Sequence, residues 1–402
     1  MLIRNLNAAY NPLFFLAALG AGGLAVSFFI YPMFLVSHPD TPIPTFNHLW
    51  PILAGPVSWQ SVLLGLDLLA VLFFAYLHFR LLFWNIREYR LFRQTPAYDK
   101  LRDSNAEISL MAIPLTLAMS INTMFVLGGL FVPNLWSVVE YLFPLALTGF
   151  LAIGVYALKI LTTYFARTLT NGNVDFSANN SLAPMIAIFA LAMISVGLAA
   201  PAAMSGNRAM ITIGLLASLF FLTIAALLAI IKLVHGFQAM MAKGINEPAS
   251  PSLWLIIPIL TLMGITWIRL SHGLQHGFDV PIDHTGLLML GAVILSAQIL
   301  FGLIGHAVMN RLGYFTHYSK GEKGNAGTFS LICPGVAFFV FGMFFIHVGL
   351  VQNGLIEHSS WAHYLVMIPF VLVQAKTIEV MLRIKRNILH AEPAMQASPA
   401  QG

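Results

Sequence analysis

Histidines are the residues of this sequence whose type and spacing best suit chemistry. There are 13 in 402 residues, and eight fall toward one end of the hydrophobic segments described below: His38, His48, His272, His276, His284, His347, His358 and His363. His272 and His276 are four residues apart, so on a continuous helix both imidazoles point the same way, as metal or haem coordination requires.

A second spacing relates His347 to this pair. His272 lies fourteen residues after Pro258 and His347 thirteen after Pro334, which puts the two histidines at nearly the same level of two helices that begin alike. We therefore predict that His272, His276 and His347 converge. Three such imidazoles suit haem iron, copper or zinc. They also suit a pH-sensitive vestibule, or ordinary interfacial positions.

A weaker pair, His78 and His306, lies toward the opposite ends of two other segments. Such side chains commonly reach from a helix end into the interface. The alternative is that this pair clamps a second haem. Haem b and copper are the cofactors that the histidines suggest, whereas a simple channel would need neither.

The single cysteine, Cys333, excludes an internal disulfide and a zinc site built on paired cysteines. It stands just before a proline at the start of a hydrophobic segment. A thiolate at a helix N-terminus is stabilised by the helix dipole and by free N–H groups, which makes Cys333 a possible redox or soft-metal residue. The alternative is a small buried hydrophobic side chain.

Two charged residues, Asp67 and Arg269, lie well inside hydrophobic segments. Intramembrane ionisable residues are functional candidates by default. Paired, they would form a structural bridge. If Arg269 instead faces a pore, it supplies a positive potential that attracts an anion. Asn122 is a candidate for polar pore lining, or for a hydrogen bond between helices.

Composition defines the elements that must position these residues. The chain is 58% hydrophobic and only 9% charged, whereas about a quarter of the residues of a soluble domain are charged. Hydrophobic segments long enough to cross a bilayer predict an all-α integral membrane protein with ten transmembrane helices, at 12–36, 60–83, 106–132, 138–166, 181–203, 208–240, 252–276, 285–312, 328–351 and 361–382.

Charge distribution predicts the topology. Of the twenty Lys and Arg residues, eighteen lie at one set of helix ends, and only Arg208 and Arg269 lie on the other side. The positive-inside rule then makes both termini cytoplasmic, in the inner membrane if the protein is bacterial. We expect one transmembrane domain over 1–389 and a short disordered cytoplasmic tail over 390–402.

Several function classes are unsupported. The basic residues lie between hydrophobic segments and form no patch for nucleic acid. No nucleotide-binding loop, dinucleotide fingerprint or hydrolase triad is legible, so neither ATP-driven transport nor soluble-type catalysis is indicated. The lipid bilayer and a small solute are the expected partners.

A proline marks the start of every odd-numbered segment: Pro12, Pro114, Pro184, Pro258 and Pro334. Proline in a first turn costs nothing, but deeper in a helix it frees a carbonyl that neighbours or water must satisfy. Helices that line an interior can meet that need. The repeat therefore predicts five helical hairpins, with the odd helices as an inner ring and the even helices outside.

With five hairpins, prolines and neighbouring glycines in the odd helices and a phenylalanine-rich ninth helix, the chain resembles the ten-helix tellurite-resistance and dicarboxylate-transporter proteins (TehA-like), which include plant slow anion channels. The resemblance implies a pore within five inner helices, occluded by a phenylalanine of the ninth helix, and a homo-oligomer, a trimer in several members. The matching residues here are Phe338, Phe341 and Phe345, with Phe341 nearest mid-membrane. Packing against lipid or core is their alternative role.

The Cys333-Pro334-Gly335 start of the ninth helix is also similar to a bacterial branch named TsoY, in which we expect some members to be selenoproteins with selenocysteine at a comparable position. That similarity implies a redox role for Cys333. Together these features predict a channel or secondary transporter for a small anion, more a transporter than an enzyme. The alternative is a membrane redox protein that holds haem or copper among its histidines.

Overall fold

The structure is a computed structural model that describes residues 2–171, 181–321 and 323–390. Over these residues the chain forms helices and loops without strands, and ten helices are long and apolar enough to cross a membrane. The prediction of an all-α membrane protein with ten spans is confirmed. In chain order the spans are Pro12–Leu35, Trp59–Phe92, Asn105–Phe131, Leu135–Thr170, Ala183–Met204, Arg208–Lys243, Glu247–Phe278, His284–Arg311, Ala326–Val351 and Trp361–Leu389.

The odd spans form the inside of the bundle, as the prolines predict. In their most apolar stretches 67% to 83% of the residues are buried, against 22% to 39% in the even spans. The inner helices are α1 (Phe15–Leu35), α5 (Ala112–Phe131), α7 (Ile186–Met204), α9 (Ile256–Phe278) and α11 (Ile332–Phe344).

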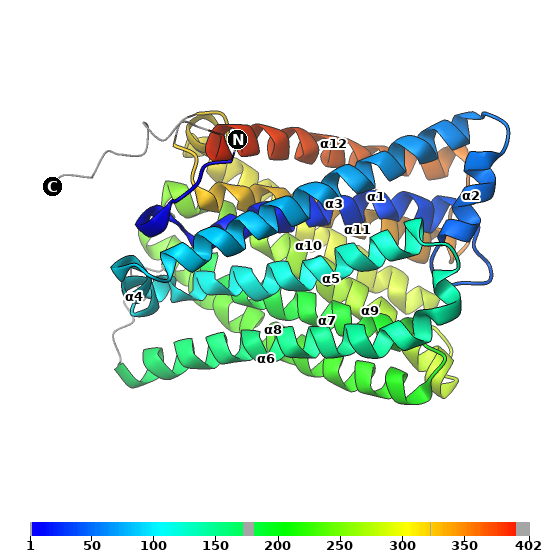
Figure 1. Cartoon of the computed structure of the whole chain (residues 1–402), viewed down its shortest axis with the longest axis horizontal. Coiled ribbons are helices and arrows are strands. Elements are labelled where there is room, and N and C mark those ends of the chain that lie inside the picture. Colours follow the sequence, from blue (N-terminus) through cyan, green and yellow to red (C-terminus); the bar gives the residue numbers. More distant parts are fainter. Residues whose placement is uncertain (1, 172–180, 322, 391–402) are drawn as a thin grey trace.

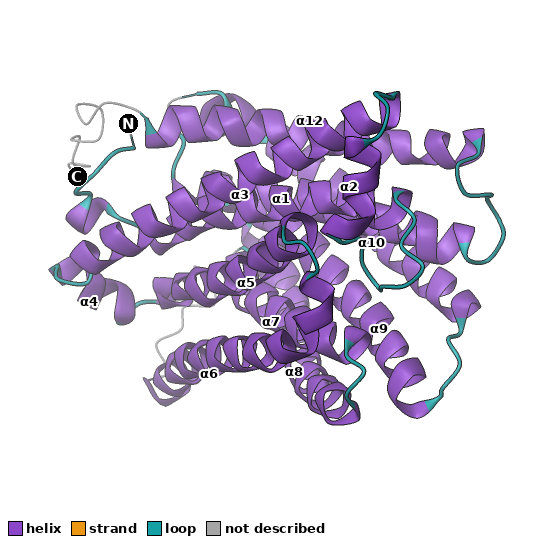
Figure 2. Ribbon diagram, turned by 45° about the vertical axis from the view of Figure 1, so that its right-hand side comes forward, coloured by secondary structure: helices purple, strands orange, loops and turns teal. Residues whose placement is uncertain are grey.

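The outer helices each contact the inner helix that precedes them, so the unit is a helical hairpin. They are α3 (Trp59–Phe92), α6 (Val139–Asn171), α8 (Arg208–Lys243), α10 (His284–Arg311) and α12 (Trp361–Leu389). Figure 1 shows the long helices running roughly along one axis, and Figure 2 shows loops gathered at their ends.

A 3₁₀ turn leads into every inner helix. These turns are η2 (Pro12–Phe14), η3 (Asn105–Met111), η5 (Ala183–Met185), η6 (Glu247–Leu255) and η8 (Ala326–Leu331). Each repeat proline lies in such a turn or in the first turn of the α-helix that follows, where proline is tolerated best. The remaining short elements are η1 (Asn7–Ala9), α2 (Phe46–Ala54), α4 (Pro96–Arg102), η4 (Leu135–Val138) and the π-helix η7 (Phe315–Ser319).

The ninth span departs from a regular helix before it ends. After Phe344 the chain continues as a π-helix, η9 (Phe345–Val351). The amide of Gln352 donates to the carbonyl of His347 over 3.0 Å, which is the i to i+5 pattern of a π-helix. Side chains beyond Phe344 therefore point in directions that α-helical counting does not give.

The two ends of the described chain lie side by side. The amide of Ile3 donates to the carbonyl of Leu389 over 3.0 Å, and Figure 1 shows the N-terminus next to the end of α12. Which side of the membrane this end faces stays a prediction. The predicted tail over 390–402 lies outside the described residues except for His390.

Candidate functional site

A cavity of about 150 Å³ lies within the ring of inner helices, and all five of them contribute to its lining. Most of its lining residues are aliphatic, aromatic or methionine side chains. The polar exceptions are Asn122, Thr261, Arg269 and Cys333. Such a space has room for several water molecules or a small ion.

Arg269, on α9, is the only charged residue among the described residues that line this cavity. Its Nη1 donates a hydrogen bond to the carbonyl of Val196 on α7, over 2.7 Å. Asn122, on α5, also lines the cavity, and its amide contacts the sulfur of Met193 at 3.5 Å. The structure thus brings Arg269 and Asn122 to one interior space. Their role in a pore stays a prediction.

Asp67 lies elsewhere and forms no bridge with Arg269. Its side chain is buried on α3, and neither carboxylate oxygen has a hydrogen-bond partner within the described part of the chain. The ion pairs found among the described residues include neither Asp67 nor Arg269. An unpartnered carboxylate in a membrane interior is costly.

The face of α11 that looks into the cavity is formed by Cys333, Val336, Ala337, Val340 and Phe344. These positions follow the three- and four-residue spacing of one helix face. Cys333 is buried there. Its predicted redox or soft-metal role stays a prediction.

The predicted gate residues point elsewhere, because none of Phe338, Phe341 and Phe345 is among the described residues that line the cavity. The ring of Phe341 fills the space beside Gly264 of α9, where a Cβ would lie 2.4 Å from its Cε2.

The other two predicted gate residues, Phe338 on α11 and Phe345 on η9, pack against outer helices. Phe338 packs on Phe370 of α12, with ring centroids 5.1 Å apart, and Phe345 lies beside Gly291 of α10. A phenylalanine gate on this span stays a prediction. Phe344 is the phenylalanine of this span that lines the cavity, so it is the better candidate.

The loop between α1 and α2 contributes Ile43 to the cavity lining. His48 orders this loop. Its Nδ1 accepts the amide proton of Thr45 at 3.1 Å, so its Nε2 donates to Asp40 at 2.7 Å. This hydrogen bond lowers the pKa of the exposed Asp40 carboxyl below its ordinary value.

The histidines of the predicted weaker pair, His78 and His306, have different surroundings. His78 is buried on α3 and bonds the carbonyl of Ala18 at 2.8 Å and the hydroxyl of Ser120 at 2.9 Å. His306 packs against the ring of Phe315, with centroids 5.5 Å apart. Both ring nitrogens of His78 are thus engaged by α1 and α5. The second haem site stays a prediction.

Two of the three histidines predicted to converge, His272 and His276, lie on α9. His272 donates from Nδ1 to the carbonyl of Ile268 one turn earlier, over 2.8 Å, and His276 is exposed in the last turn. The group of three potential metal ligands found among the described residues contains His347 but neither of these two. The role of His272 and His276 as ligands together with His347 stays a prediction.

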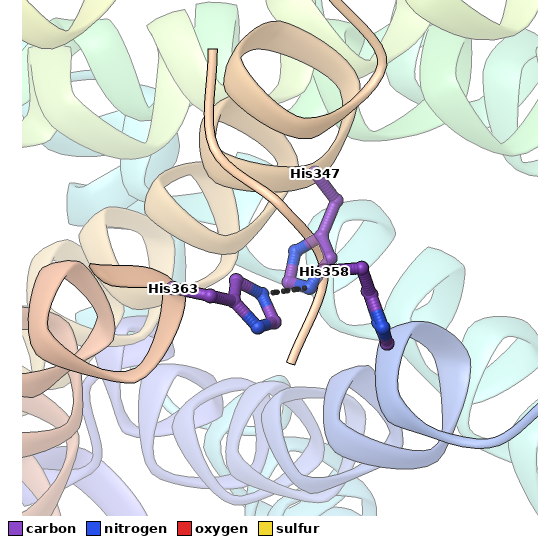
Figure 3. A group of neighbouring side chains, drawn as sticks. All are labelled: His347, His358 and His363. Carbon is purple, nitrogen blue, oxygen red and sulfur yellow. Dashed lines mark hydrogen bonds between the residues drawn. The ribbon is translucent and has the colours of Figure 1, made fainter. Parts of the chain in front are cut away.

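His347 instead meets His358 and His363, and one ligand nitrogen from each ring lies within 4.8 Å of the others. Figure 3 shows His347 on η9, His363 at the start of α12 and His358 on the loop between them. The Nε2 atoms of His347 and His363 are 3.0 Å apart. The sequence signal for this group was the short hairpin loop, which brings the end of one span beside the start of the next.

Comparison with known proteins adds no family assignment, since no protein-family model, curated protein or solved structure matches the chain. The resemblance to TehA-like proteins and to the TsoY branch therefore stays a prediction from the sequence.

Proposed function

We propose that this protein is a channel or secondary transporter that passes a small anion through the cavity between its inner helices. One observation carries the proposal: the single charged residue among the described lining residues, Arg269, is a cation in a space lined mostly by apolar side chains. A guanidinium carries its charge at any physiological pH and presents five N–H donors. A fixed positive charge in a low-dielectric passage attracts anions and repels cations.

The lining also limits the size of the solute. A space of about 150 Å³ with few polar groups favours an ion that is small and gives up its water easily. The resemblance of the sequence to TehA-like proteins supports the same class of solute, and the trimer that it implies is part of this proposal.

Proteoliposomes loaded with purified protein test the role of Arg269. We expect Arg269→Gln to lower chloride and nitrate flux at least tenfold, because it removes the cation while keeping a polar side chain of similar length. Arg208→Gln is the matched control. Arg208 is also a basic residue at this end of the bundle, but it is exposed, lies over the ring of Phe278 and is not among the residues that line the cavity.

Flux that stays unchanged in folded Arg269→Gln would refute the role of the guanidinium. Equal losses in both variants would instead indicate a general effect of surface charge.

A membrane redox protein is the second candidate, favoured by the group of His347, His358 and His363. An absorption spectrum of the purified protein tests the haem version. A Soret band would support it, and a featureless visible spectrum from protein made with ample haem would oppose it.

A further inference from the structure

We infer that His347, His358 and His363 form a binding site for one divalent transition-metal ion of the zinc and copper type, at the end of the bundle opposite the termini. The inference is independent of the proposed anion transport. It rests on the hydrogen bonds that orient the three imidazoles, and on the elements that bring them together.

The spacing of the rings is close to that of a metal centre. Zinc binds histidine nitrogens at about 2.0 to 2.1 Å in tetrahedral geometry, which puts two ligand nitrogens about 3.3 Å apart. The Nε2 atoms of His347 and His363 are 3.0 Å apart. If the two rings moved apart by a few tenths of an ångström, the distance between these nitrogens would match that of two ligands of one ion.

Two of the three rings already have the hydrogen bonds that metal-binding histidines make. His347 donates from Nδ1 to the carbonyl of Met343 at 2.7 Å, and His358 donates from Nε2 to the carbonyl of Phe34 at 3.0 Å. Each carbonyl fixes the protonated nitrogen and leaves a lone pair on the other nitrogen of that ring. In His358 this lone pair, on Nδ1, accepts from the hydroxyl of Ser359 at 2.9 Å, a bond that an ion would replace. Carbonyl partners of this kind hold the tautomer and the orientation of metal-binding histidines.

The third ring must change its tautomer when the ion binds. The amide of Ser359 donates to Nδ1 of His363 at 3.1 Å, so the proton of the neutral ring is on Nε2, between the two rings. Binding through Nε2 moves this proton to Nδ1 and replaces the bonds to Ser359 and His347 with a bond to the metal. The ring stays neutral, because the proton moves from one ring nitrogen to the other.

The surroundings of the group match the donor set. His347 and His363 are buried, and the ring of Phe34 stacks on His347 with centroids 4.2 Å apart and planes 7° apart. His358 is exposed, so it gives an ion access from solvent.

The donors also decide which metal fits. The group found among the described residues contains imidazoles only. Zinc and copper accept such donors, whereas Mg²⁺ and Ca²⁺ require oxygen ligands. Three protein ligands leave a fourth coordination position open.

The local backbone positions His347 for this contact. The residue lies in the π-helix η9. π-Helical turns are rare in proteins overall, but where they occur they are often at functional sites. The three histidines come from η9, from the following loop and from α12, and the carbonyl of Phe34 comes from α1. An ion here would join the last hairpin to the first inner helix.

Titration calorimetry of the full-length protein, purified in detergent and stripped with a chelator, tests the site with Zn²⁺ and Cu²⁺ as probes. We expect one ion per chain, and no binding of Mg²⁺ or Ca²⁺. His347→Ala and His363→Ala should each lower the affinity more than 100-fold, since loss of a ligand exceeds the 10- to 100-fold effect of an outer-sphere change. His276→Ala, an exposed histidine outside the group, should leave the affinity unchanged.

Variants at the two buried histidines could lose affinity by losing their fold, so His358→Ala provides the independent test. His358 is exposed, and its removal leaves the pair of buried rings intact. We expect a loss of more than 100-fold, as for the other two ligands, with an unchanged elution profile. The inference is wrong if the unaltered folded protein binds neither ion, or if His358→Ala and His276→Ala bind equally well.

Discussion

His347 and His363 lie 16 residues apart in the chain with their Nε2 atoms 3.0 Å apart. One ring comes from the π-helix at the end of an inner span and the other from the start of the outer span that follows. Both histidines are buried. A short loop and a change of helix type thus place two imidazoles in contact at the end of the bundle.

Metal binding at this pair should stabilise the protein. A ligand that binds only the folded state adds about 2.7 kcal/mol at a free concentration of 100 times its Kd. We therefore expect Zn²⁺ to raise the Tm of the unaltered protein by several degrees in a scanning fluorescence assay. In His358→Ala the shift should largely disappear, and a full shift in that variant would contradict a three-histidine site.

Phe344 should limit solute flux, because its ring faces the cavity. We expect Phe344→Ala to raise chloride uptake by proteoliposomes severalfold, since it removes a large apolar side chain from the passage. Phe341→Ala is the comparison. That ring is 1% exposed and packs beside Gly264, so its loss should cost about 3 to 5 kcal/mol of stability. A rise in flux in Phe341→Ala alone would restore the gate predicted from the sequence.

The contrast between Phe344 and Phe341 shows which features of the fold can be predicted from the sequence. Hydrophobic length and proline position predicted ten spans and the inner ring, because both depend on local properties of the chain. The helix face that meets the cavity depends on how α9 and α10 pack against α11, and no spacing within one helix reveals it. Gly264 leaves room for the ring of Phe341, and this role of the glycine is visible only once the packing of the two helices is known.

The histidine site was missed for a related reason. Counting from Pro258 and Pro334 assumed two regular helices, whereas the second becomes π-helical at Phe345. The count compared depth along two spans and gave no lateral distance between them. His358 and His363 lie at the same end of the bundle, but their contact with His347 depends on the loop between the helices.

Close packing at Gly264 gives a test of the α9 and α11 interface. A Cβ at this position would lie 2.4 Å from Phe341 Cε2 and 2.7 Å from Ile294 Cδ1. We expect Gly264→Ala to cost about 1 to 3 kcal/mol, the usual range for overpacking. Gly302→Ala on α10 is the control, since its Cβ meets nothing within 4 Å. Equal thermal stability of the two variants would argue against this packing.

Asp67 should tolerate loss of its charge. Its buried carboxylate oxygens have no hydrogen-bond partner among the described residues, so the ionised form is costly in the membrane interior. We expect Asp67→Asn to keep or raise the Tm, whereas Asp279→Asn, at the exposed end of α9, should have little effect. A clear fall in the Tm of Asp67→Asn would show that the carboxylate has a stabilising partner.

Ion selectivity of the unaltered protein tests the central claim most directly. Proteoliposomes are given labelled chloride and labelled rubidium under the same gradient, and uptake is compared with that of protein-free liposomes. Because Arg269 is the only charge among the described cavity-lining residues, we predict chloride uptake above background and rubidium uptake at background. Preferential rubidium uptake, or background uptake of both ions by folded protein, would contradict an anion pathway through this cavity.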